Sequence, residues 1–422
     1  MTQNDAPAQC GPNYSKKNRP TFDAALHIIG EKVRPLGEER IAVANSSGRR
    51  ITRMVQAFRD CPPFDVSAMD GFAINAHDLV SGEDRSLMLT IGAPAYAGEA
   101  ARTSSPGEAI PINTGAPIPK GTGAVLIKEA AKIERGHLHL NEQLPSGMNI
   151  RFRGEDAHAG QAMLTVDQVM HPAAIGALSA YGVATVFVRL RPKVALLVSG
   201  DELRNGHQEP GDFGIFDANG PMIAAALEAS GAMVNCLPPV NDNPEAIRDR
   251  LKHIISTDVD MIATTGGVSA GAHDFLPAVL SSLGAQIHFH GVSMRPGKPV
   301  LFGTLPDDRP VFCLPGNPVS ALVGTRFFVG RAIRAMVGLD AEKPEVTVSV
   351  PVHKPDLTLV LKARRRRNGT STDAPDILPG QQSHMLHPLL QADCWVVSPA
   401  DGLARVFPLY DPLSQHFSGP IG

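Results

Sequence analysis

Four loops in the second half of the sequence carry hydroxyl or acidic side chains, three of them together with glycines, and each follows a short apolar run. These loops are LLVSGDEL, PVNDNP, ATTGGVSAGAHD and FCLPGNPVSA. Their candidate ligand-binding residues are Ser199, Gly200, Glu202, Asp242, Gly266, Gly267, Ser269, Asp274, Pro315, Gly316 and Pro318. Glycine-rich backbone at the start of a helix offers N–H donors to a phosphate or another oxyanion. The sequence therefore predicts an anion site where these loops meet.

Three of these residues, Glu202, Asp242 and Asp274, are carboxylates that need a counter-charge if they converge. Two unit charges about 4 Å apart repel by roughly 4 kcal/mol at an effective dielectric constant of about 20. Oxygen ligands without a set of Cys or His residues favour Mg²⁺ over zinc. Helix capping by Asp242 and Asp274 is the alternative, and the sequence leaves both interpretations open.

Two cations, Arg295 and Lys298, flank a Pro-Gly turn in MRPGKPVLFG. Held on a stiff turn, they would form a compact receptor for an anion. The alternative is a turn whose charges are simply solvated.

Acidic residues also occur in the first half, in CPPFDVSAMDGFAI at residues 61–74. Two prolines and a glycine exclude a long helix there, yet Asp65 and Asp70 stand among apolar side chains. Two later stretches, INTGAPIPKGTGAVLIKE and RFRGEDAHAG, contain Thr114 and Asp156. Taken alone, each of these two predicts a loop fixed by local contacts.

A hydrolase is the competing enzymatic interpretation. Residues 267–271 match the G-x-S-x-G pattern of a nucleophile elbow, after a predicted strand and before a predicted helix. Asp307 or Asp308 and His384 or His387 follow in the order of a catalytic triad. This interpretation leaves Asp70, Asp156 and Lys298 without a role.

The composition bounds the class of protein. The 422 residues are 43% hydrophobic and 19% charged, which is typical of a globular chain of about three domains. A net charge of −3 excludes the basic surface by which proteins bind nucleic acid or anionic membranes. No run is long enough for a membrane span, the first 20 residues lack the apolar core of a signal peptide, and five scattered cysteines favour reduced thiols in the cytoplasm.

The order of elements positions these motifs. After Pro192, apolar runs alternate with helical stretches, which is typical of a doubly wound α/β domain whose ligands bind beyond the carboxyl ends of the strands. We predict a multidomain α/β fold with four parts. These are a discontinuous helical linker domain (21–59 and 150–190), an inserted β-rich domain (60–149), the α/β domain (191–340) and a small C-terminal β-barrel (341–422).

Seven motifs together resemble the molybdopterin molybdenumtransferase family, which includes MoeA and the E domain of gephyrin. They are PPFDVSAMDGFA, NTGAPIPKGTGAVL, RFRGEDAHAG, VSGDEL, TTGGVSAGAHDF, RPGKP and LPGNPVSA, and they extend from about residue 21 to 340. The resemblance implies a cytoplasmic transferase of molybdenum cofactor biosynthesis. It would insert molybdate into adenylated molybdopterin, bound by the α/β domain, and release AMP in a Mg²⁺-dependent step.

The resemblance also implies roles for individual residues. The catalytic set is Asp70, Asp156, Glu202, Asp242, Asp274 and Lys298. Glu202 and Asp274 would hold Mg²⁺, whereas Lys298 and Arg295 would bind phosphate or molybdate oxygens. The substrate-binding set is Thr114, Ser199, Gly200, Gly266, Gly267, Ser269, Arg295, Pro315, Gly316, Pro318 and Ser383.

The implied assembly is a homodimer whose active cleft lies between the subunits, so that Asp70 serves the partner's cleft. The molybdopterin adenylyltransferase is the implied partner protein. Two positions depart from the family pattern: Ser199 replaces Thr, and Arg295 replaces Lys. The C-terminal region departs further, because LTLVLKARRRRNG replaces an expected Arg-containing strand. The alternative function is a non-catalytic molybdopterin-binding or scaffold paralogue.

Overall fold

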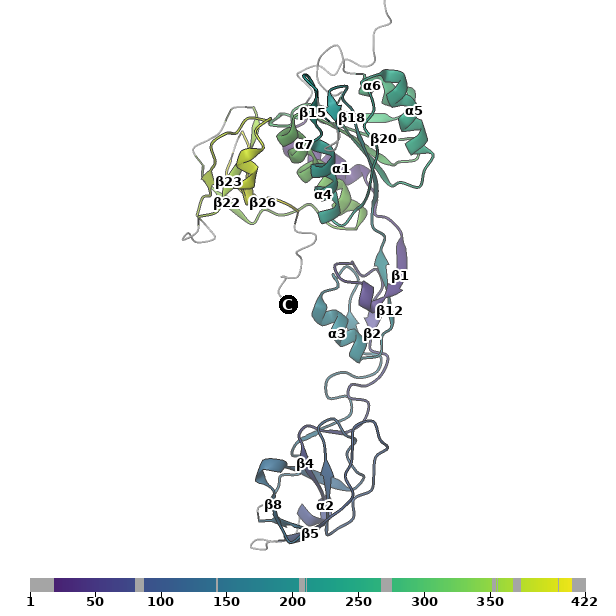
Figure 1. Ribbon diagram of the computed structural model, residues 1–422, viewed down its shortest axis with the longest axis vertical. Helices are drawn as coiled ribbons and strands as arrows, with labels where there is room; N and C mark the ends of the chain where they lie inside the picture. The colour runs from purple at the N-terminus through teal and green to yellow at the C-terminus, as the bar shows by residue number, and fades with distance from the viewer. Residues whose placement is uncertain are drawn as a thin grey trace, which may run out of the picture. The chain divides into compact units, whose positions relative to one another are not determined.

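The structure is a computed structural model that describes residues 19–79, 87–141, 143–204, 209, 211–266, 275–350, 354, 356–366, 373–400 and 402–411. They form two compact units, shown as ribbons in Figure 1. Unit 1 is built from the chain up to residue 39 and from residue 189 onward, and unit 2 from residues 40–188. Unit 1 is therefore discontinuous in sequence, as expected when one segment is inserted into another.

Unit 1 contains a six-stranded mixed sheet. Its strand order is β16 (Met233–Cys236), β13 (Lys193–Val198), β17 (Met261–Thr265), β21 (Pro310–Leu314), β20 (Leu301–Thr304) and β18 (Gln286–His290). The first four strands are parallel, and β20 and β18 add an antiparallel edge. Parallel pairing aligns the carboxyl ends of β13, β17 and β21, so that the loops that follow them start at one edge of the sheet.

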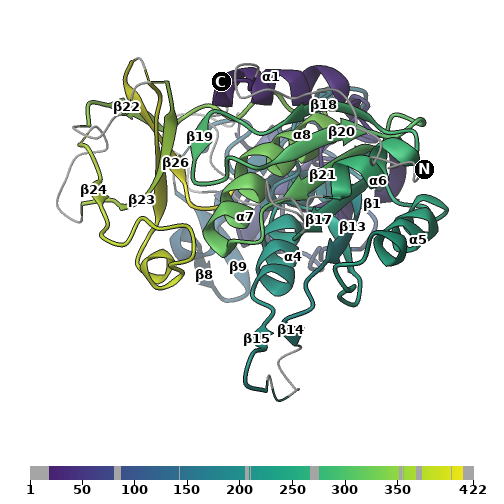
Figure 2. The ribbon, with the colours of Figure 1, turned by 90° about the horizontal axis from the view of Figure 1, so that it is seen from above.

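Helices cover both faces of this sheet (Figure 2). They are α1 (Phe22–Lys32), α4 (Asn219–Ala229), α5 (Pro244–Ile255), α6 (Leu276–Ser282), α7 (Pro318–Gly324) and α8 (Gly330–Met336), the last two joined by a π-helical turn at Thr325–Val329. Alternate residues of β13 point to opposite faces. Val194 and Leu196 pack with α1, α4, α7 and α8. Ala195 and Leu197 pack with α5 and α6. The predicted doubly wound layering is confirmed.

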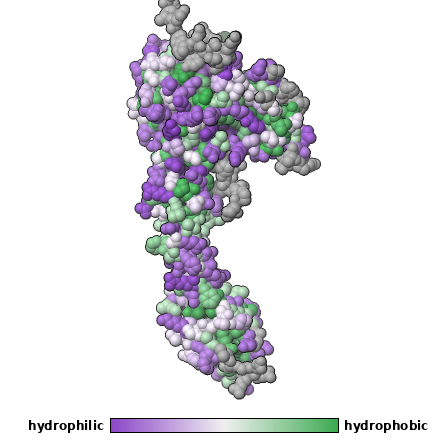
Figure 3. Space-filling model, turned by 180° about the vertical axis from the view of Figure 1, so that it is seen from behind, coloured by the Kyte–Doolittle hydropathy of each residue, from purple (hydrophilic) through white to green (hydrophobic). Residues whose placement is uncertain are grey.

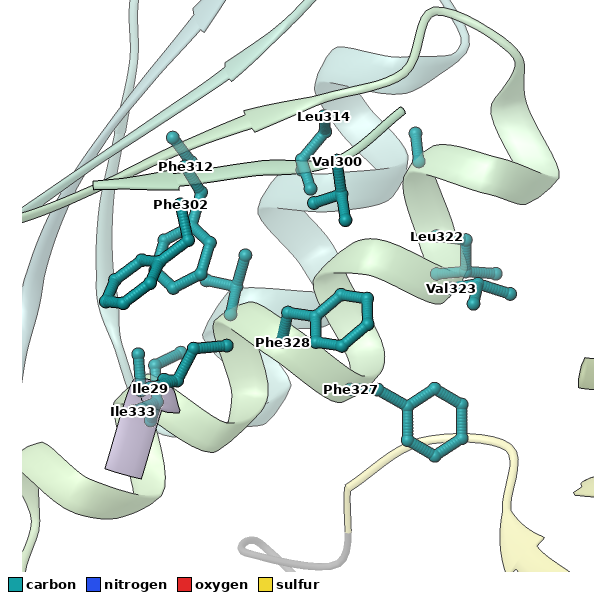
Figure 4. Packing of buried hydrophobic residues seen from close by; sticks show 14 of the residues in the cluster. Ile29, Val300, Phe302, Phe312, Leu314, Leu322, Val323, Phe327, Phe328 and Ile333 are labelled. Carbon is teal, nitrogen blue, oxygen red and sulfur yellow. The ribbon is translucent and has the colours of Figure 1, made fainter. Parts of the chain in front are cut away.

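The core on the α1 side is rich in aromatic rings (Figure 4). Phe302 and Phe312, on neighbouring strands, stack with ring centroids 4.9 Å apart. Phe22 of α1 meets Phe327 edge-on at 5.2 Å. Such pairs contribute about 0.5–1.5 kcal/mol beyond area burial. They fix the first helix of the chain against the last helices of the α/β layer.

A second sheet in unit 1 is built from the C-terminal part of the chain. Its order is β19 (Met294–Arg295), β23 (Thr358–Arg364), β25 (Cys394–Ser398), β26 (Ala404–Pro408) and β22 (Val346–Val348), with β24 (Asp376–Ile377) also paired to β23. A short 3₁₀ helix, η5, covers His387–Leu390. Closure of this sheet into a barrel stays a prediction. Strand β19 belongs to the segment predicted as the α/β domain. The sequence did not indicate that this strand would pair with β23 of the C-terminal sheet. The remaining pair of unit 1 is β14 (Leu203–Arg204) with β15 (Ile215–Phe216).

Unit 2 contains a six-stranded sheet in the order β7 (Thr122–Ile127), β4 (Gly71–Asn75), β6 (Glu108–Ile112), β5 (Leu87–Ile91), β9 (His137–Leu140) and β8 (Lys132–Glu134). Its two-stranded pairs are β3 (Val66–Ser67) with β10 (Ile150–Arg151), β2 (Val55–Gln56) with β11 (Ala162–Leu164), and β1 (Glu38–Ala42) with β12 (Thr185–Arg189). The helices are α2 (Ala76–Leu79) and α3 (Pro172–Ala180), with short turns η2 (Val43–Asn45) and η3 (Lys128–Ala130). Helix α3 begins with Pro172 and is followed by Gly182 at φ +78°. The predicted β-rich character is confirmed, and the finer division into four domains stays a prediction.

The surface is mixed in character. On the face that Figure 3 shows, hydrophobic residues are interspersed with hydrophilic ones. None of the helices that the structure describes is both long and apolar enough to cross a membrane.

Candidate active site

A cavity of about 680 Å³ in unit 1 contains four of the predicted site residues. Arg295, Lys298, Pro315 and Ser383 all line it. Its described lining also includes Arg19, and Asp356 is the one carboxylate there. The cavity is therefore electropositive, because three cationic side chains and one carboxylate line it. Its chemistry suits a small oxyanion or a phosphorylated ligand.

The two predicted cations extend from the turn that begins at β19. Gly297 lies between them at φ +94°, a backbone conformation that favours glycine. The turn is closed by a hydrogen bond from the Val292 N–H to the Lys298 carbonyl, at 2.9 Å. Both cationic side chains are exposed, and neither forms an ion pair within the described part of the chain. They are therefore available to a ligand.

Ser383 comes from a turn that follows β24. Its carbonyl accepts a hydrogen bond of 3.0 Å from the Val319 N–H in the first turn of α7. Pro315 and Asn317, which precede that helix, line the same cavity. The C-terminal region thus supplies one wall of the cavity and the α/β layer the other.

The loops after β17 and β21 are tied together by a residue that the sequence analysis missed. Asn219, at the start of α4, donates through Nδ2 to the Gly316 carbonyl at 2.7 Å and to Thr265 Oγ1 at 3.1 Å. Thr265 Oγ1 in turn donates to the Pro315 carbonyl at 3.1 Å. This network fixes the loop that carries Gly316 and Pro318. The only sequence cue was an Asn before a helix, which is usually just a cap.

Ser199 and Gly266 meet at the ends of β13 and β17. A Cβ atom on Gly266 would lie 2.4 Å from the Ser199 carbonyl oxygen, and its φ is +97°. Both facts require glycine. Ser199 Oγ is buried and has no hydrogen-bond partner among the described residues. A buried hydroxyl without a partner is a natural contact for a ligand.

Two predicted acids of unit 1, Glu202 and Asp242, lie on the loops after β13 and β16 and are not part of the cavity lining. Glu202 is exposed on the segment after β13, next to Gly200. Asp242 donates its N–H to Asp201 Oδ1 at 3.1 Å, and its own Oδ1 is buried without a partner among the described atoms. Of the two interpretations left open for Asp242, the structure does not support the helix cap, because Asn243 caps α5 by accepting from the N–H groups of Glu245 and Ala246.

Three predicted site residues, Gly267, Ser269 and Asp274, fall outside the described residues. No group of three or more His, Cys, Asp or Glu able to hold a metal occurs among the positions that the structure describes.

The strand directions argue against Asp307 or Asp308 as the acid of a hydrolase triad, whose candidate nucleophile Ser269 lies outside the described residues. Residues 267–271 follow the carboxyl end of β17, whereas Asp307 and Asp308 precede β21, which runs parallel to it. A five-residue strand spans about 17 Å, so the proposed acid would stand at the wrong edge of the sheet. Asp307 is instead paired with Arg309, whose hydrogen bond is the main cause of its lowered pKa.

Asp70 is held by a single partner in unit 2. Asp70 Oδ1 accepts from the N–H of Thr114 at 2.6 Å and from its hydroxyl at 2.8 Å. These two donors, the N–H first, lower the pKa of the Asp70 carboxyl. Antiparallel pairing of Gly71 with Ile112 brings the two residues together. Asp70 and Met69 of this loop are exposed, while Phe72 is buried.

Asp156 also lies in unit 2. Its Oδ2 accepts a hydrogen bond of 3.0 Å from the Tyr181 hydroxyl, and its N–H donates to the Cys61 carbonyl. Burial and this hydrogen bond raise the pKa of Tyr181. The carboxylate is exposed and fixed in orientation. Unit 2 therefore presents two oriented acids.

The comparisons with known proteins agree on one family. Residues 20–182 match a family model described as the MoeA N-terminal region (domain I and II), and residues 195–335 match one described as a probable molybdopterin binding domain. The chain is 31% identical to a molybdopterin molybdenumtransferase of Synechococcus elongatus, over 90% of this chain and 95% of the relative. It is 32% identical to one from Staphylococcus aureus over 78% of this chain and 79% of the relative. The fold is similar to that of a molybdopterin biosynthesis MoeA protein from Pyrococcus horikoshii, with a TM-score of 0.72 at 24% identity, covering 93% of this chain and 98% of that one.

Proposed function

Because the chain belongs to the molybdopterin molybdenumtransferase family, we propose that it inserts molybdate into adenylated molybdopterin and releases AMP. The observation that carries the proposal is the electropositive cavity lined by Arg295, Lys298 and Ser383, which suits a tetrahedral oxyanion. The proposed reaction requires such binding, since both molybdate and the leaving nucleotide are anions. The protein acts in molybdenum cofactor biosynthesis, and we place it in the cytoplasm.

Each part of the site has a proposed task. Lys298 and Arg295 bind molybdate or phosphate oxygens and offset their charge. The Ser199 hydroxyl and the loop at Gly316 contact the pterin and its phosphate. Hydrogen bonds of the backbone hold the turns that carry Lys298 and Gly316 before the substrate arrives, so that little reorganisation of these turns is needed during the reaction.

Mg²⁺ fits the donor chemistry of the three predicted acids of this region. Glu202, Asp242 and Asp274 offer oxygen ligands only, and one Asp242 oxygen is buried without a partner among the described atoms. We assign Glu202 and Asp274 as the residues that hold the ion. When bound, Mg²⁺ would neutralise charge on the phosphoanhydride.

The decisive experiment measures AMP release and active-cofactor formation by the purified protein. Adenylated molybdopterin, Mg²⁺ and micromolar molybdate are supplied to the wild type, Lys298→Ala and Asp274→Asn. Lys252→Ala and Asp249→Asn, both exposed on α5, are the matched controls. We expect turnover to be lost in Lys298→Ala and Asp274→Asn and kept in the controls. A wild type that binds pterin without turnover would favour the scaffold alternative.

A homodimer is also proposed, with Asp70 of one subunit serving the cleft of the other. Mixing Asp70→Asn with Lys298→Ala subunits tests this arrangement. If the cleft is shared, each mixed dimer has one intact site, and an equal mixture recovers about one quarter of the wild-type activity. No recovery would place both residues in the site of one subunit. The molybdopterin adenylyltransferase is the proposed partner protein, because it would supply the adenylated substrate.

A further inference from the structure

Lys362, in the middle of β23, is a buried lysine without an acidic partner. Its exposed fraction is 1%. Its Nζ donates to three backbone carbonyls, those of Gly380 at 2.6 Å, Met385 at 3.1 Å and Gln382 at 3.3 Å. The described residues provide no carboxylate within ion-pair distance. Burying an ammonium is costly unless all its donors are satisfied, and here three donors meet three carbonyls.

The backbone of Lys362 also holds this turn, through the side chain of Gln381. The Gln381 side chain accepts from the Lys362 N–H at 3.0 Å and donates to the Lys362 carbonyl at 2.9 Å. On its far side, the turn is held by the hydrogen bond from Val319 N–H to the Ser383 carbonyl. The turn from Gly380 to Met385 is therefore fixed between β23 and the start of α7. An ordinary surface turn would not have three such attachments.

The carbonyl contacts determine where the neighbouring N–H groups point. In a trans peptide, the C=O of one residue and the N–H of the next point in opposite directions. Because the Gln382 carbonyl points to Lys362, the Ser383 N–H points away from it. The N–H groups of Gln382, Ser383 and His384 find no acceptor among the described residues. All three residues line the cavity that also contains Arg295 and Lys298.

We propose that Lys362 is a positioning residue that orients the Gly380–Met385 turn so that Ser383 offers its N–H and its hydroxyl to a tetrahedral oxyanion in this cavity. Arg295 and Lys298 supply the charge, and the turn supplies the direction of the hydrogen bonds. The inference rests on the proposed function only for the identity of the oxyanion, which is molybdate or the phosphate of the pterin substrate.

Binding measurements on the purified full-length protein test this inference. Calorimetric titrations with sodium molybdate and, separately, inorganic phosphate compare the wild type with Lys362→Met and Lys362→Arg. Arg366→Met, an exposed cation paired with Asp376, is the control. We expect Lys362→Met to weaken oxyanion binding by about tenfold to a hundredfold, Lys362→Arg to restore part of it, and the control to bind like wild type.

Hydrogen exchange separates positioning from general damage. In Lys362→Met, the Met385 amide, which donates to the Gln382 carbonyl, and the Val319 amide, which donates to the Ser383 carbonyl, should exchange faster while those of β13 and β17 stay protected. If Lys362→Met does not fold, Lys362→Gln, which keeps two donors without the charge, takes its place. Weaker molybdate binding alone identifies molybdate as the ligand, and weaker phosphate binding alone identifies the phosphate.

Unchanged binding of both anions in a variant whose turn exchanges faster would overturn the inference. The test does not depend on turnover. A wild type that binds oxyanion in a Lys362-dependent way without releasing AMP would refute the proposed reaction and leave the positioning role standing.

Discussion

At the scale of single residues, the acids of this protein are oriented by neutral donors as well as by charges. Asp70 takes two hydrogen bonds from Thr114 and has a pKa below the ordinary 3.8. Asp60 likewise accepts from the Ala159 N–H, which with Arg153 lowers its pKa. A carboxylate held in this way stays ionised and keeps one orientation.

Thr114→Val should therefore raise the pKa of Asp70. The hydroxyl donor is lost while the backbone N–H remains, so part of the depression persists. A depressed carboxyl pKa contributes stability that is present above the ordinary value and is lost as the pH falls through the folded-state value. In the variant this contribution is smaller, and its loss is complete at a higher pH. Titration of the Asp70 carboxyl by NMR measures the shift, and an unchanged pKa would contradict the assignment.

Arg326 and Glu342 form a second, buried pair whose disruption should be costly. Two hydrogen bonds of 2.7 Å join them, and the side chains are 3% and 13% exposed. Burial raises the pKa of Glu342 despite the arginine. Arg326→Met leaves a buried carboxyl without its partner, and we expect a loss of about 3 kcal/mol in the free energy of unfolding.

The double variant Arg326→Met/Glu342→Leu should regain most of that loss, because no uncompensated charge remains. Urea denaturation of the two single variants and the double variant gives the coupling energy. Additive losses would show that the pair does not act as a unit.

At the scale of elements, close backbone approach decides where glycine is required. A Cβ on Gly71, the first residue of β4, would lie 2.0 Å from the Leu126 carbonyl oxygen of β7. Strand pairing at this point leaves no room for a side chain. The same strand start places Asp70 beside Thr114, so packing of the sheet and orientation of the acid depend on one residue.

Gly71→Ala should destabilise unit 2 by about 1 to 3 kcal/mol through overpacking. Gly176→Ala is the matched control, because this exposed glycine of α3 has open space at its Cβ position. It should stabilise the helix by about 0.5 to 1 kcal/mol. Thermal unfolding of both variants measures the two effects, and equal signs would refute the argument.

Helices and strands were predicted well where the apolar residues follow one period along the sequence. The alternation of apolar runs and helices after Pro192 predicted the α/β layers, because buried parallel strands and amphipathic helices have distinct patterns. The antiparallel edge formed by β20 and β18 was not predicted, since strand direction depends on pairing partners far away in sequence. Asn219 and Lys362 were missed for the same reason: an Asn before a helix and a Lys in a strand are ordinary locally, and their partners are distant.

The site was predicted in pieces. The motif residues Arg295, Lys298 and Ser383 do share one cavity, although about 85 residues separate the last two. The sequence indicated that strand-end loops converge, and it could not indicate that the acids Glu202 and Asp242 are not among the residues that line the cavity. That distinction depends on how the loop after β13 turns, which local patterns do not determine.

At the scale of the whole molecule, the chain has two compact units and passes between them through β1 and β12. Hydrogen bonds from Leu190 N–H to the Gly37 carbonyl and from Val43 N–H to the Ala184 carbonyl show that these strands are antiparallel. In unit 1, Arg405 of β26 pairs with Asp23 of α1, although the two are 382 positions apart. The two sequence segments of unit 1, one before and one after the insertion, are thus in direct contact.

Residues 38–189, produced alone, should fold, because this segment has its own core and its two ends are paired with each other. The intact protein should show two calorimetric transitions, one of which matches the isolated fragment. A single transition in the intact chain, with an unfolded fragment, would show that unit 2 depends on unit 1.

The antiparallel pairing of β1 with β12 also has an evolutionary consequence. Because the insertion enters and leaves through neighbouring strands, its removal leaves two ends that a two-residue Asn-Gly turn can join into a hairpin. A single genetic event could therefore have added or deleted the whole of unit 2 without breaking the sheet or helices of unit 1. Unit 1 and unit 2 could have evolved as separate proteins before they were joined in one chain.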